Sequence, residues 1–366
     1  LNGDLCNALT GRSDSHALLE RLYHANLFLV PLDDEGQWYR THQLFTDLLR
    51  DLQERRDQKG TVTLHLRASE WFVQAGLVSE AIQHALAAQE YTFAIGLIES
   101  HAMDMLMQWH LKTVDGWMGS IPAEWIAQNP QANIVFAWMH LMRPDYPQAI
   151  PYLERLEAMF SDPRLGSDDP ALLARWLTLQ SMLLNAQGNA AECLQLCNQA
   201  LELVPEKDNH VRNMIYLELA KAYEQSDDYD RAMQTYQTII RGGQTSGNSV
   251  TELLGASGLG LLALKHGKLH YAFEIISEGI ERIERSGSLP PISTAVYGEL
   301  GVIYYQWHQL EQAHHYFQRS IQVSALSGYS DAELYYGVIL SRLYHIQGDL
   351  DRAAQEIQKS VDLMKV

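Results

Sequence analysis

A motif that recurs about every 40 residues is the feature that most constrains the fold of this chain. Within "GDLDRAAQEIQKSV" a small residue, Ala353, serves as an anchor on which other segments can be aligned. The spacings between successive anchors are 40, 41, 40 and 39 residues, running back from Ala353 through Ala313, Ala272, Ala232 and Cys193. A period of this length predicts a stack of similar helical units rather than a single globular core.

The residues around each anchor give the repeat its type. Large side chains stand nine positions before and four positions after most anchors, as Tyr304 and Phe317 do around Ala313. A small anchor lets two antiparallel helices approach closely, and the large residues fill the space between consecutive pairs. We therefore predict an all-α fold, a tetratricopeptide-like right-handed superhelix of antiparallel helix pairs. Weaker copies of the pattern are anchored at Ala149 and Ala81.

The beginning of the chain differs from the rest. Two short strands are predicted at Leu27–Pro31 and Gln37–Thr41, on either side of an Asp-Asp-Glu-Gly turn, with a helix before and a helix after them. This order predicts a small winged-helix-like unit with one β-hairpin. We expect three parts: this unit at 1–58, degenerate helical repeats at 59–130 and the main superhelix at 131–366.

Composition narrows the possible partners. The formal net charge is 27 − 45 = −18, which disfavours contact with nucleic-acid phosphates. No apolar run approaches the roughly 20 residues of a transmembrane helix, so we expect no membrane contact. Three cysteines are too few for a disulfide scaffold and predict a cytoplasmic protein. Because the chain begins with Leu1 rather than Met, we expect it to be a fragment of a longer protein.

Several patterns resemble reactive sites, but the repeat accounts for them. Cys193 and Cys197 fall on positions that must be buried, which favours core packing over a redox pair. "GASGLG" at 255–260 has the wrong spacing for a phosphate loop. In "YYQWHQLEQAHHYFQRS" at 304–320, His314 and His315 diverge by roughly 100° on a helix and cannot both chelate one ion. We predict no catalytic or metal site, and hence no enzyme.

The concave face of the superhelix is the predicted binding surface. Counting from the anchors, first-helix positions place on this face Arg175, Thr178, Met182, Asn185, Met214, Leu217, Lys221, Glu224, Gln225, Leu261, Lys265, Tyr305, Gln306, Tyr335, Arg342 and His345. The polar residues that we expect to bind a ligand are Arg175, Lys221, Glu224, Tyr305, Arg342 and His345.

The mixture on this face favours a small polar ligand, such as a sugar or an organic acid. A scaffold that binds a peptide or protein partner on the same face is the alternative, and a solvated inner face that binds no ligand is the third interpretation. We expect replacement of Lys221 or Tyr305 by Ala to weaken ligand binding and barely change stability.

One stretch is more specific than the repeats. Residues 18–51, "LLERLYHANLFLVPLDDEGQWYRTHQLFTDLLRD", resemble the winged-helix segment of the MalT-like family of ATP-dependent, LuxR-type transcription activators. "ASEWFVQAGLVSEAIQHALAAQEYTFAIGLIE" is similar to the first helical repeat that follows in that family. The resemblance covers roughly residues 1–130 by motif and the remainder by repeat architecture.

The resemblance implies a function for each part of the chain. In that family an ATPase module precedes the winged helix, a helical superhelix senses the inducer, and a C-terminal helix-turn-helix binds DNA. This chain then corresponds to the middle two parts, with no cofactor of its own and ATP expected in the missing N-terminal module. Its partners are a small-molecule inducer or a regulatory protein, without direct contact to nucleic acid, and the full-length protein is a possible homo-oligomer. Arg40 and His42 become candidates for the interface with the ATPase, and the acidic "DDEG" tip disfavours phosphate.

Overall fold

A computed structural model describes most of the chain, in which two compact units are distinguished. The described residues are 1–33, 36–107, 110–143, 145–161, 169–287, 289–327 and 331–363. One unit comprises residues 1–103 and 112–135, and the other comprises residues 104–111 and 136–366. The finer division into three parts remains a prediction, and two residues of the acidic tip, Asp34 and Glu35, lie outside the described residues.

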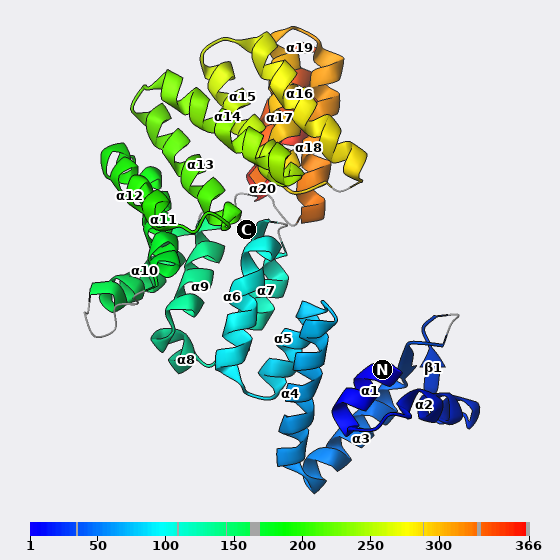
Figure 1. The fold of residues 1–366 in the computed structure, drawn as a ribbon. Coiled ribbons are helices and arrows are strands. Elements are labelled where there is room, and N and C mark those ends of the chain that lie inside the picture. The colour runs from blue at the N-terminus through cyan, green and yellow to red at the C-terminus, as the bar shows by residue number, and fades with distance from the viewer. Residues whose placement is uncertain are drawn as a thin grey trace. The chain divides into compact units, whose positions relative to one another are not determined.

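The first unit begins with the predicted helix–hairpin–helix order (Figure 1). Its elements up to the third helix are α1 (Gly3–Thr10), α2 (Ser15–His24), β1 (Leu29–Pro31), β2 (Tyr39–Thr41) and α3 (Gln43–Arg56). The two strands pair antiparallel, with Val30 opposite Arg40. The winged-helix-like unit with one hairpin is thus confirmed, with strands two residues shorter at their starts than the sequence suggests.

Aromatic residues attach the hairpin to the helices around it. Tyr39 is buried in a small core with Leu19 of α2 and Leu29 of β1. The neighbouring Trp38 faces the opposite way and meets Trp71 of α4 edge-on, with ring centroids 6.4 Å apart. Alternation between Trp38 and Tyr39, the first residue of β2, therefore lets one short segment contact two separate helices.

Helical repeats follow the hairpin in the same unit. They comprise α4 (Gln58–Gln74), α5 (Val78–Ala87), most of α6 (Tyr91–Met107), α7 (Leu111–Met118), α8 (Ala123–Gln128) and the start of α9 (Pro130–Met142). The predicted anchor Ala81 is fully buried and clusters with Ala68 and Phe72 of α4 and with Leu5 of α1. The hairpin-bearing segment and the first helix pair therefore share a core.

The second unit is the predicted array of helix pairs (Figure 1). Its helices after α9 are α10 (Tyr146–Ser161), α11 (Pro170–Ala186), α12 (Ala190–Leu203), α13 (Asn209–Gln225), α14 (Tyr229–Ser246), α15 (Ser249–Lys265), α16 (Leu269–Ser286), α17 (Ser293–Gln306), α18 (Leu310–Ser327), α19 (Asp331–Ile346) and α20 (Leu350–Leu363). Each helix packs on the next, and the first helices of consecutive pairs also touch, α11 with α13, α13 with α15, α15 with α17 and α17 with α19. These first helices therefore form one continuous surface.

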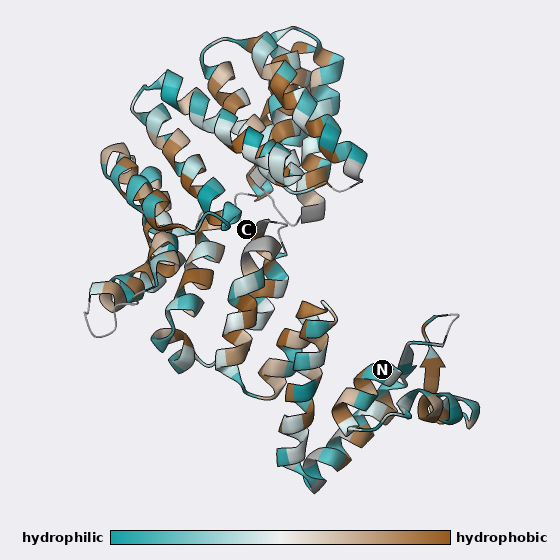
Figure 2. Ribbon diagram, viewed as in Figure 1, coloured by the Kyte–Doolittle hydropathy of each residue, from teal (hydrophilic) through white to brown (hydrophobic). Residues whose placement is uncertain are grey.

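The repeat anchors lie where the pairs pack most closely. Cys193, Ala232, Ala272 and Ala313 are fully buried, and Ala353 is nearly so. Brown apolar and teal polar residues alternate along these helices, as expected when each helix buries one face (Figure 2). The tetratricopeptide-like all-α fold is confirmed, and the register read from the sequence is the observed one. Among the described residues, no helix is long and apolar enough to cross a membrane.

The turns inside the pairs repeat as regularly as the anchors. The residue five positions before each anchor has a positive φ, at Gly188, Asp227, Gly267, His308 and Gly348. This left-handed conformation ends the first helix and suits glycine best. His308 therefore lies in a turn, as predicted, and "GASGLG" lies inside α15 rather than in a loop.

Candidate functional site

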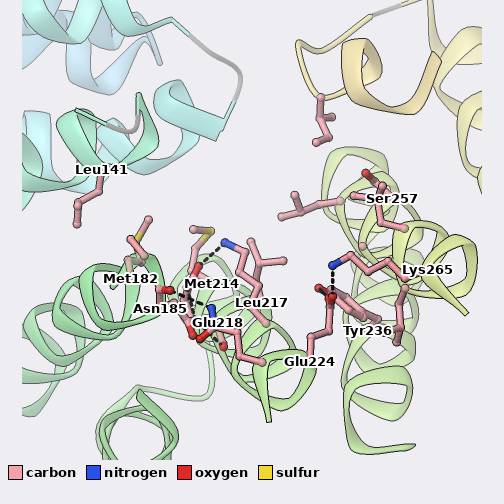
Figure 3. A pocket seen from close by; sticks show the side chains of 18 of the residues that line it. Leu141, Met182, Asn185, Met214, Leu217, Glu218, Glu224, Tyr236, Ser257 and Lys265 are labelled. Carbon is pink, nitrogen blue, oxygen red and sulfur yellow. Dashed lines mark hydrogen bonds and ion pairs between the residues drawn. The ribbon is translucent and has the colours of Figure 1, made fainter. Parts of the chain in front are cut away.

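A cavity of about 890 Å³ lies in the second unit, on the surface formed by α11, α13 and α15 (Figure 3). Side chains from the three first helices line it together with residues from α9, α10 and α14. Its apolar wall includes Leu141, Met182, Met214, Leu217, Leu254 and Leu261. The volume lies within the range of about 300–1,000 Å³ that is usual for small-molecule sites.

Helical periodicity explains why these residues share the cavity. On α13, Met214, Leu217, Lys221 and Glu224 are three or four positions apart and so lie on one face of the helix. The same helix also packs against its partner α14. Each first helix presents the same kind of face, so neighbouring repeats combine into one wall.

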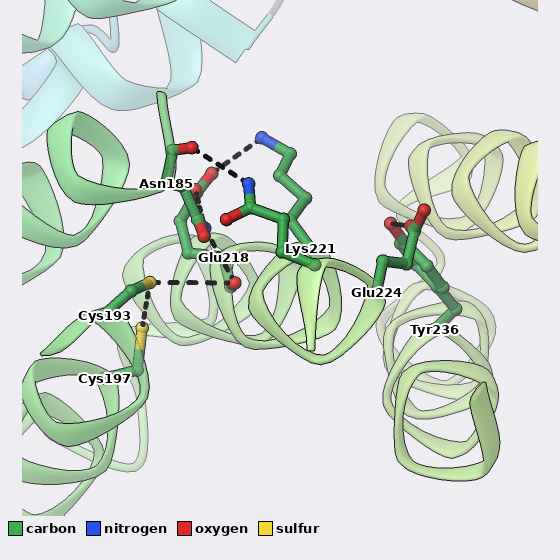
Figure 4. A network of polar contacts seen from close by, with 8 residues as sticks. Asn185, Cys193, Cys197, Glu218, Lys221, Glu224 and Tyr236 are labelled. Atoms are coloured by element: carbon green, nitrogen blue, oxygen red, sulfur yellow. Dashed lines mark hydrogen bonds and ion pairs between the residues drawn. The ribbon is translucent and has the colours of Figure 1, made fainter. Parts of the chain in front are cut away.

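A buried carboxylate connects α11 to α13 at one side of the cavity (Figure 4). Glu218 is only 1% exposed, and its two oxygens accept hydrogen bonds from Lys221 Nζ at 2.8 Å and Asn185 Nδ2 at 2.7 Å. Asn185 Nδ2 also donates to the backbone oxygen of Glu218, and Gln225 Nε2 donates to the backbone oxygen of Asn185. Three of these bonds join α11 to α13, and the Lys221–Glu218 pair lies within α13.

A second carboxylate connects α13 to the next pair. Glu224 accepts hydrogen bonds from the Tyr236 hydroxyl at 2.5 Å and from Lys265 Nζ at 2.8 Å. Tyr236 belongs to α14 and Lys265 to α15. One acidic side chain therefore joins three helices at the opposite side of the cavity (Figure 3).

These contacts shift the pKa of Lys221 and of Tyr236. Burial lowers the pKa of the Lys221 ammonium, but the charge and hydrogen bond of Glu218 outweigh it, and the net pKa is raised. Burial, reinforced by the negative charge of Glu224, raises the pKa of the Tyr236 phenol. At neutral pH Lys221 is therefore a cation and Tyr236 a neutral donor.

The ammonium groups lie closer to the open space than their partners do. The side chains of Lys221 and Lys265 are 45% and 66% exposed, whereas those of Glu218 and Glu224 are 1% and 13% exposed. Each ammonium has three N–H donors and uses one of them on its carboxylate. The cavity wall therefore offers hydrogen-bond donors backed by buried negative charge.

The six residues expected to bind a ligand lie in three places. Lys221 and Glu224 line the large cavity. Tyr305, Arg342 and His345 line a second hollow of about 560 Å³ formed by α17, α19 and α20. Arg175 is not among the residues lining either space, and its guanidinium pairs with Asp208 at 3.1 Å. The structure thus brings two of the six together at the cavity and another three elsewhere, and their binding role remains a prediction.

Several polar residues of the large cavity were not anticipated, and Glu218 and Tyr236 are the two that take part in the bonds described above. Glu218 directly follows Leu217, an expected inner-face residue, and interrupts the apolar run "MIYLELA". That interruption is the feature of the sequence from which a buried acid could have been predicted. Tyr236 occupies the repeat position of Phe317, where a large core residue is expected. Its ring fills that place, and its hydroxyl reaches Glu224 as well.

The histidine- and aromatic-rich stretch at 304–320 is part of the packing between pairs. Tyr304 stacks on Tyr316 with ring centroids 5.2 Å apart, and Phe317 is fully buried. His314 Nε2 lies 2.6 Å from the Tyr344 hydroxyl of the next pair. Within the described residues, no group of three or more His, Cys, Asp or Glu side chains is arranged to hold a metal ion.

The candidate interface residues of the first unit are exposed. Arg40 lies on β2 and His42 directly precedes α3. Two apolar side chains near them are exposed too. Phe28, whose backbone oxygen accepts a hydrogen bond from His42 N, is 56% exposed, and Leu44 is 74% exposed. Exposed apolar groups of this size are unusual on a free surface when they cluster.

The fold is that of a helical-repeat protein with a winged-helix-like unit, and comparisons with known families agree. Residues 1–61 match the family described as the MalT winged helix domain, and residues 174–365 match the MalT-like TPR region. The second match covers more than half of the chain. The chain therefore belongs to the MalT-like family of transcription regulators and contains its winged helix and its helical sensor or regulatory domain.

Individual relatives extend the match along the chain. The HTH-type transcriptional regulator MalT of Serratia proteamaculans is 25% identical over 364 residues, which cover 98% of this chain and 40% of that protein. The serine/threonine-protein kinase PknK of Mycobacterium tuberculosis is 32% identical over 155 residues, covering 42% of this chain and 14% of that protein. The chain thus spans about two fifths of the length of its MalT relatives.

Solved structures share the fold at low identity. A signal transduction ATPase with a tetratricopeptide repeat sensor from Pyrococcus horikoshii superimposes with a TM-score of 0.65 at 16% identity, covering 100% of this chain and 54% of that one. A Rap protein complexed with Competence and Sporulation Factor gives a TM-score of 0.57 at 10% identity, covering 73% and 75% of the two chains. These likenesses establish the architecture.

Proposed function

We propose that this chain is the effector-sensing part of a MalT-like regulator and that its α11–α15 cavity binds a small-molecule inducer. The observation that carries the proposal is the cavity itself, whose volume and largely apolar wall suit a small molecule. Lys221 and Lys265 add a few fixed hydrogen-bond donors to that wall. Inducer binding is then the signal, and the regulator's other activities depend on segments beyond this chain.

The position of the cavity gives the inducer a way to act. Its walls come from three successive first helices, whose mutual packing sets the curvature of the array. A ligand that contacts all three favours the arrangement in which the three walls fit it best. The array then exists in an arrangement that fits the ligand and in one that does not. The ligand shifts the equilibrium between them only by the difference in its affinity for the two.

Filling the cavity tests the proposal. Leu261 lines the cavity and is 43% exposed, so Leu261→Trp adds bulk there without overpacking the core. Ile150→Trp is the matched control, because Ile150 is 39% exposed and is not among the lining residues. Thermal unfolding is followed with sugars, organic acids, amides and esters as added ligands. A ligand at 100 times its Kd adds about 2.7 kcal/mol of stability.

We expect at least one ligand class to raise the melting temperature of the wild type and of Ile150→Trp, but not that of Leu261→Trp. If every class leaves the wild type unchanged, or if Leu261→Trp responds as the wild type does, the cavity is not the inducer site.

A regulatory protein or peptide is the second candidate ligand. The Rap protein that shares this fold was solved with Competence and Sporulation Factor, which shows that the architecture accepts such a partner in that protein. The second hollow at Tyr305, Arg342 and His345 extends the inner face toward α20. Loss of partner binding in Arg342→Glu, with no small-molecule response in the wild type, favours this candidate.

The remaining roles follow from the family. We propose that the chain catalyses no reaction itself and holds no cofactor, while ATP binds to an ATPase module outside it. The exposed Arg40 and His42, next to exposed apolar side chains, form the proposed contact with that module. Assembly of the complete regulator into a homo-oligomer belongs to the same proposal.

A further inference from the structure

The wall of the α11–α15 cavity is largely apolar, and many of its polar side chains are bonded to one another. Three methionines, Met142, Met182 and Met214, line it together with leucines from α13 and α15. Methionine side chains are flexible and polarisable, so they adapt to apolar ligands of irregular shape. Burying the apolar surface of a ligand against them contributes roughly 25 cal/mol per Å².

The polar side chains of the wall are largely paired with one another. Asn185 and Lys221 share Glu218, and Tyr236 and Lys265 share Glu224. A ligand rich in hydroxyl groups would have to break these bonds or leave its own groups unsatisfied. Each buried donor or acceptor without a partner costs about 1–3 kcal/mol. A saccharide therefore binds this wall poorly.

The charges of the wall disfavour an ionic ligand as well. Lys221 and Lys265 are each held 2.8 Å from a carboxylate, so the positive charge of each ammonium is already balanced by a negative one. An anion that approached either ammonium would come close to Glu218 or Glu224 and would be repelled. Like charges brought together at a binding surface cost several kcal/mol. An organic cation would meet the two ammonium groups first, since these are the exposed partners.

The two ammonium groups place outward donors on a wall that is largely apolar, although Tyr146, Asp227 and His266 also line it. Each ammonium retains N–H groups beyond the one bonded to its carboxylate, and a neutral acceptor oxygen can take one without disturbing the ion pair. Carbonyl and ether oxygens have this property and bring no charge.

We propose that the inducer is an uncharged, mainly apolar molecule with one or two acceptor oxygens, such as an amide, ester, lactone or ketone. The proposal rests on the assignment of the cavity as the inducer site. This ligand class differs from the sugar or organic acid expected from the sequence. The sequence indicates which side chains face inward, but it does not indicate that these side chains are bonded to one another.

A fluorescent probe and a set of chain-matched competitors test this ligand class. N-phenyl-1-naphthylamine is a neutral apolar probe whose emission rises in an apolar site. Its displacement is measured at pH 8 with octanamide, octanoate and a glucose trisaccharide, so that neutral, anionic and polyhydroxyl ligands are compared. We expect octanamide to compete at least tenfold more strongly than octanoate, and the trisaccharide not to compete.

The cavity variants separate failure of the ligand class from failure of the site. We expect Leu261→Trp to lose the probe signal and Ile150→Trp to retain it. If Leu261→Trp loses the signal but octanoate or the trisaccharide is the strongest competitor, the site stands and the ligand class is overturned. If Leu261→Trp binds the probe as the wild type does, or if the wild type does not bind it at all, both proposals are overturned.

Discussion

At the scale of a single residue, the buried acid Glu299 makes the stability of the protein depend on pH. It is 4% exposed on α17, and Oε1 accepts a hydrogen bond from Ser257 Oγ at 2.6 Å while Oε2 is buried without a partner. Burial raises its pKa to about 8, and the Ser257 bond opposes this only in part. The side chain is therefore largely protonated at neutral pH.

A raised pKa in the folded protein makes stability fall as the pH increases. Glu299 contributes fully below its unfolded pKa of 4.5, and this contribution is lost as the pH rises to about 8. The slope is at most about 1.4 kcal/mol per pH unit. We expect Glu299→Gln to flatten the wild-type decline in urea unfolding between pH 5 and pH 8. The exposed Glu311→Gln serves as control, and equal slopes in all three proteins would contradict the prediction.

Lys221 illustrates how a neighbouring group changes the expected effect of a substitution. Its partial exposure alone suggests that Lys221→Ala barely changes stability. Glu218 lies buried behind it, however, and loses the cation bonded to it. Because Lys221 is nearly half exposed, we expect a loss of about 1–3 kcal/mol rather than the full cost of an unpaired buried charge.

A double-mutant cycle measures this coupling. Glu218→Gln removes the charge that Lys221→Ala leaves unpaired, so the double variant should be less destabilised than the sum of the two single variants. Urea unfolding of the four proteins gives the coupling energy. Lys265→Ala is the comparison, since Glu224 retains its bond from Tyr236. If the effects of the two substitutions on the free energy of unfolding were additive, the Lys221–Glu218 ion pair would not contribute to stability.

The cavity residues show how far sequence reasoning reaches at this scale. Counting from the anchors places Lys221, Glu224 and Lys265 on the inner face, because helical periodicity alone determines which side of a helix a residue occupies. The bond from Asn185 to Glu218 spans 33 residues, and no local pattern encodes it. Tyr305 and Arg342 share the predicted face but line another hollow, since periodicity does not indicate where that face is concave.

At the scale of elements, the anchor alanines determine how closely the helices of a pair approach. Ala353 is 8% exposed on α20, and its carbonyl oxygen accepts a hydrogen bond from Ser341 Oγ of α19 at 2.8 Å. We expect Ala353→Leu to overpack this contact and cost about 1–3 kcal/mol in urea unfolding. The adjacent Ala354 is exposed, so Ala354→Leu should have little effect. If the two variants were equally stable, Ala353 would not be the close contact.

Helix positions were accessible from sequence because the same constraint recurs in each pair. A small residue at the anchor and a left-handed residue five positions earlier mark the contact and the turn, as Ala313 and His308 do between α17 and α18. The first unit gave a weaker signal, and β1 begins at Leu29 instead of Leu27. Strand ends depend on pairing across the hairpin, which the sequence of one strand does not specify.

At the scale of the whole molecule, the chain is about two fifths of the length of its MalT relatives, and Arg40 is the residue proposed to connect it to the remainder. Arg40 is exposed on β2, directly after the buried Tyr39. Reversal of an exposed surface charge usually changes stability by no more than about 0.5 kcal/mol. We therefore expect Arg40→Glu to leave the unfolding of this chain unchanged.

The same substitution should matter in a full-length regulator that contains this chain. If Arg40 contacts the ATPase module, Arg40→Glu places a repulsive or unpaired charge in that contact and alters ATP-dependent transcription activation. Lys59→Glu, a charge reversal at an exposed position of α4, is the control and should leave activation near the wild-type level. Normal activation by Arg40→Glu would remove this residue from the interface. Unfolding of the shorter chain would instead make the role of Arg40 structural, because a residue that only contacts a missing module cannot stabilise the unit without it.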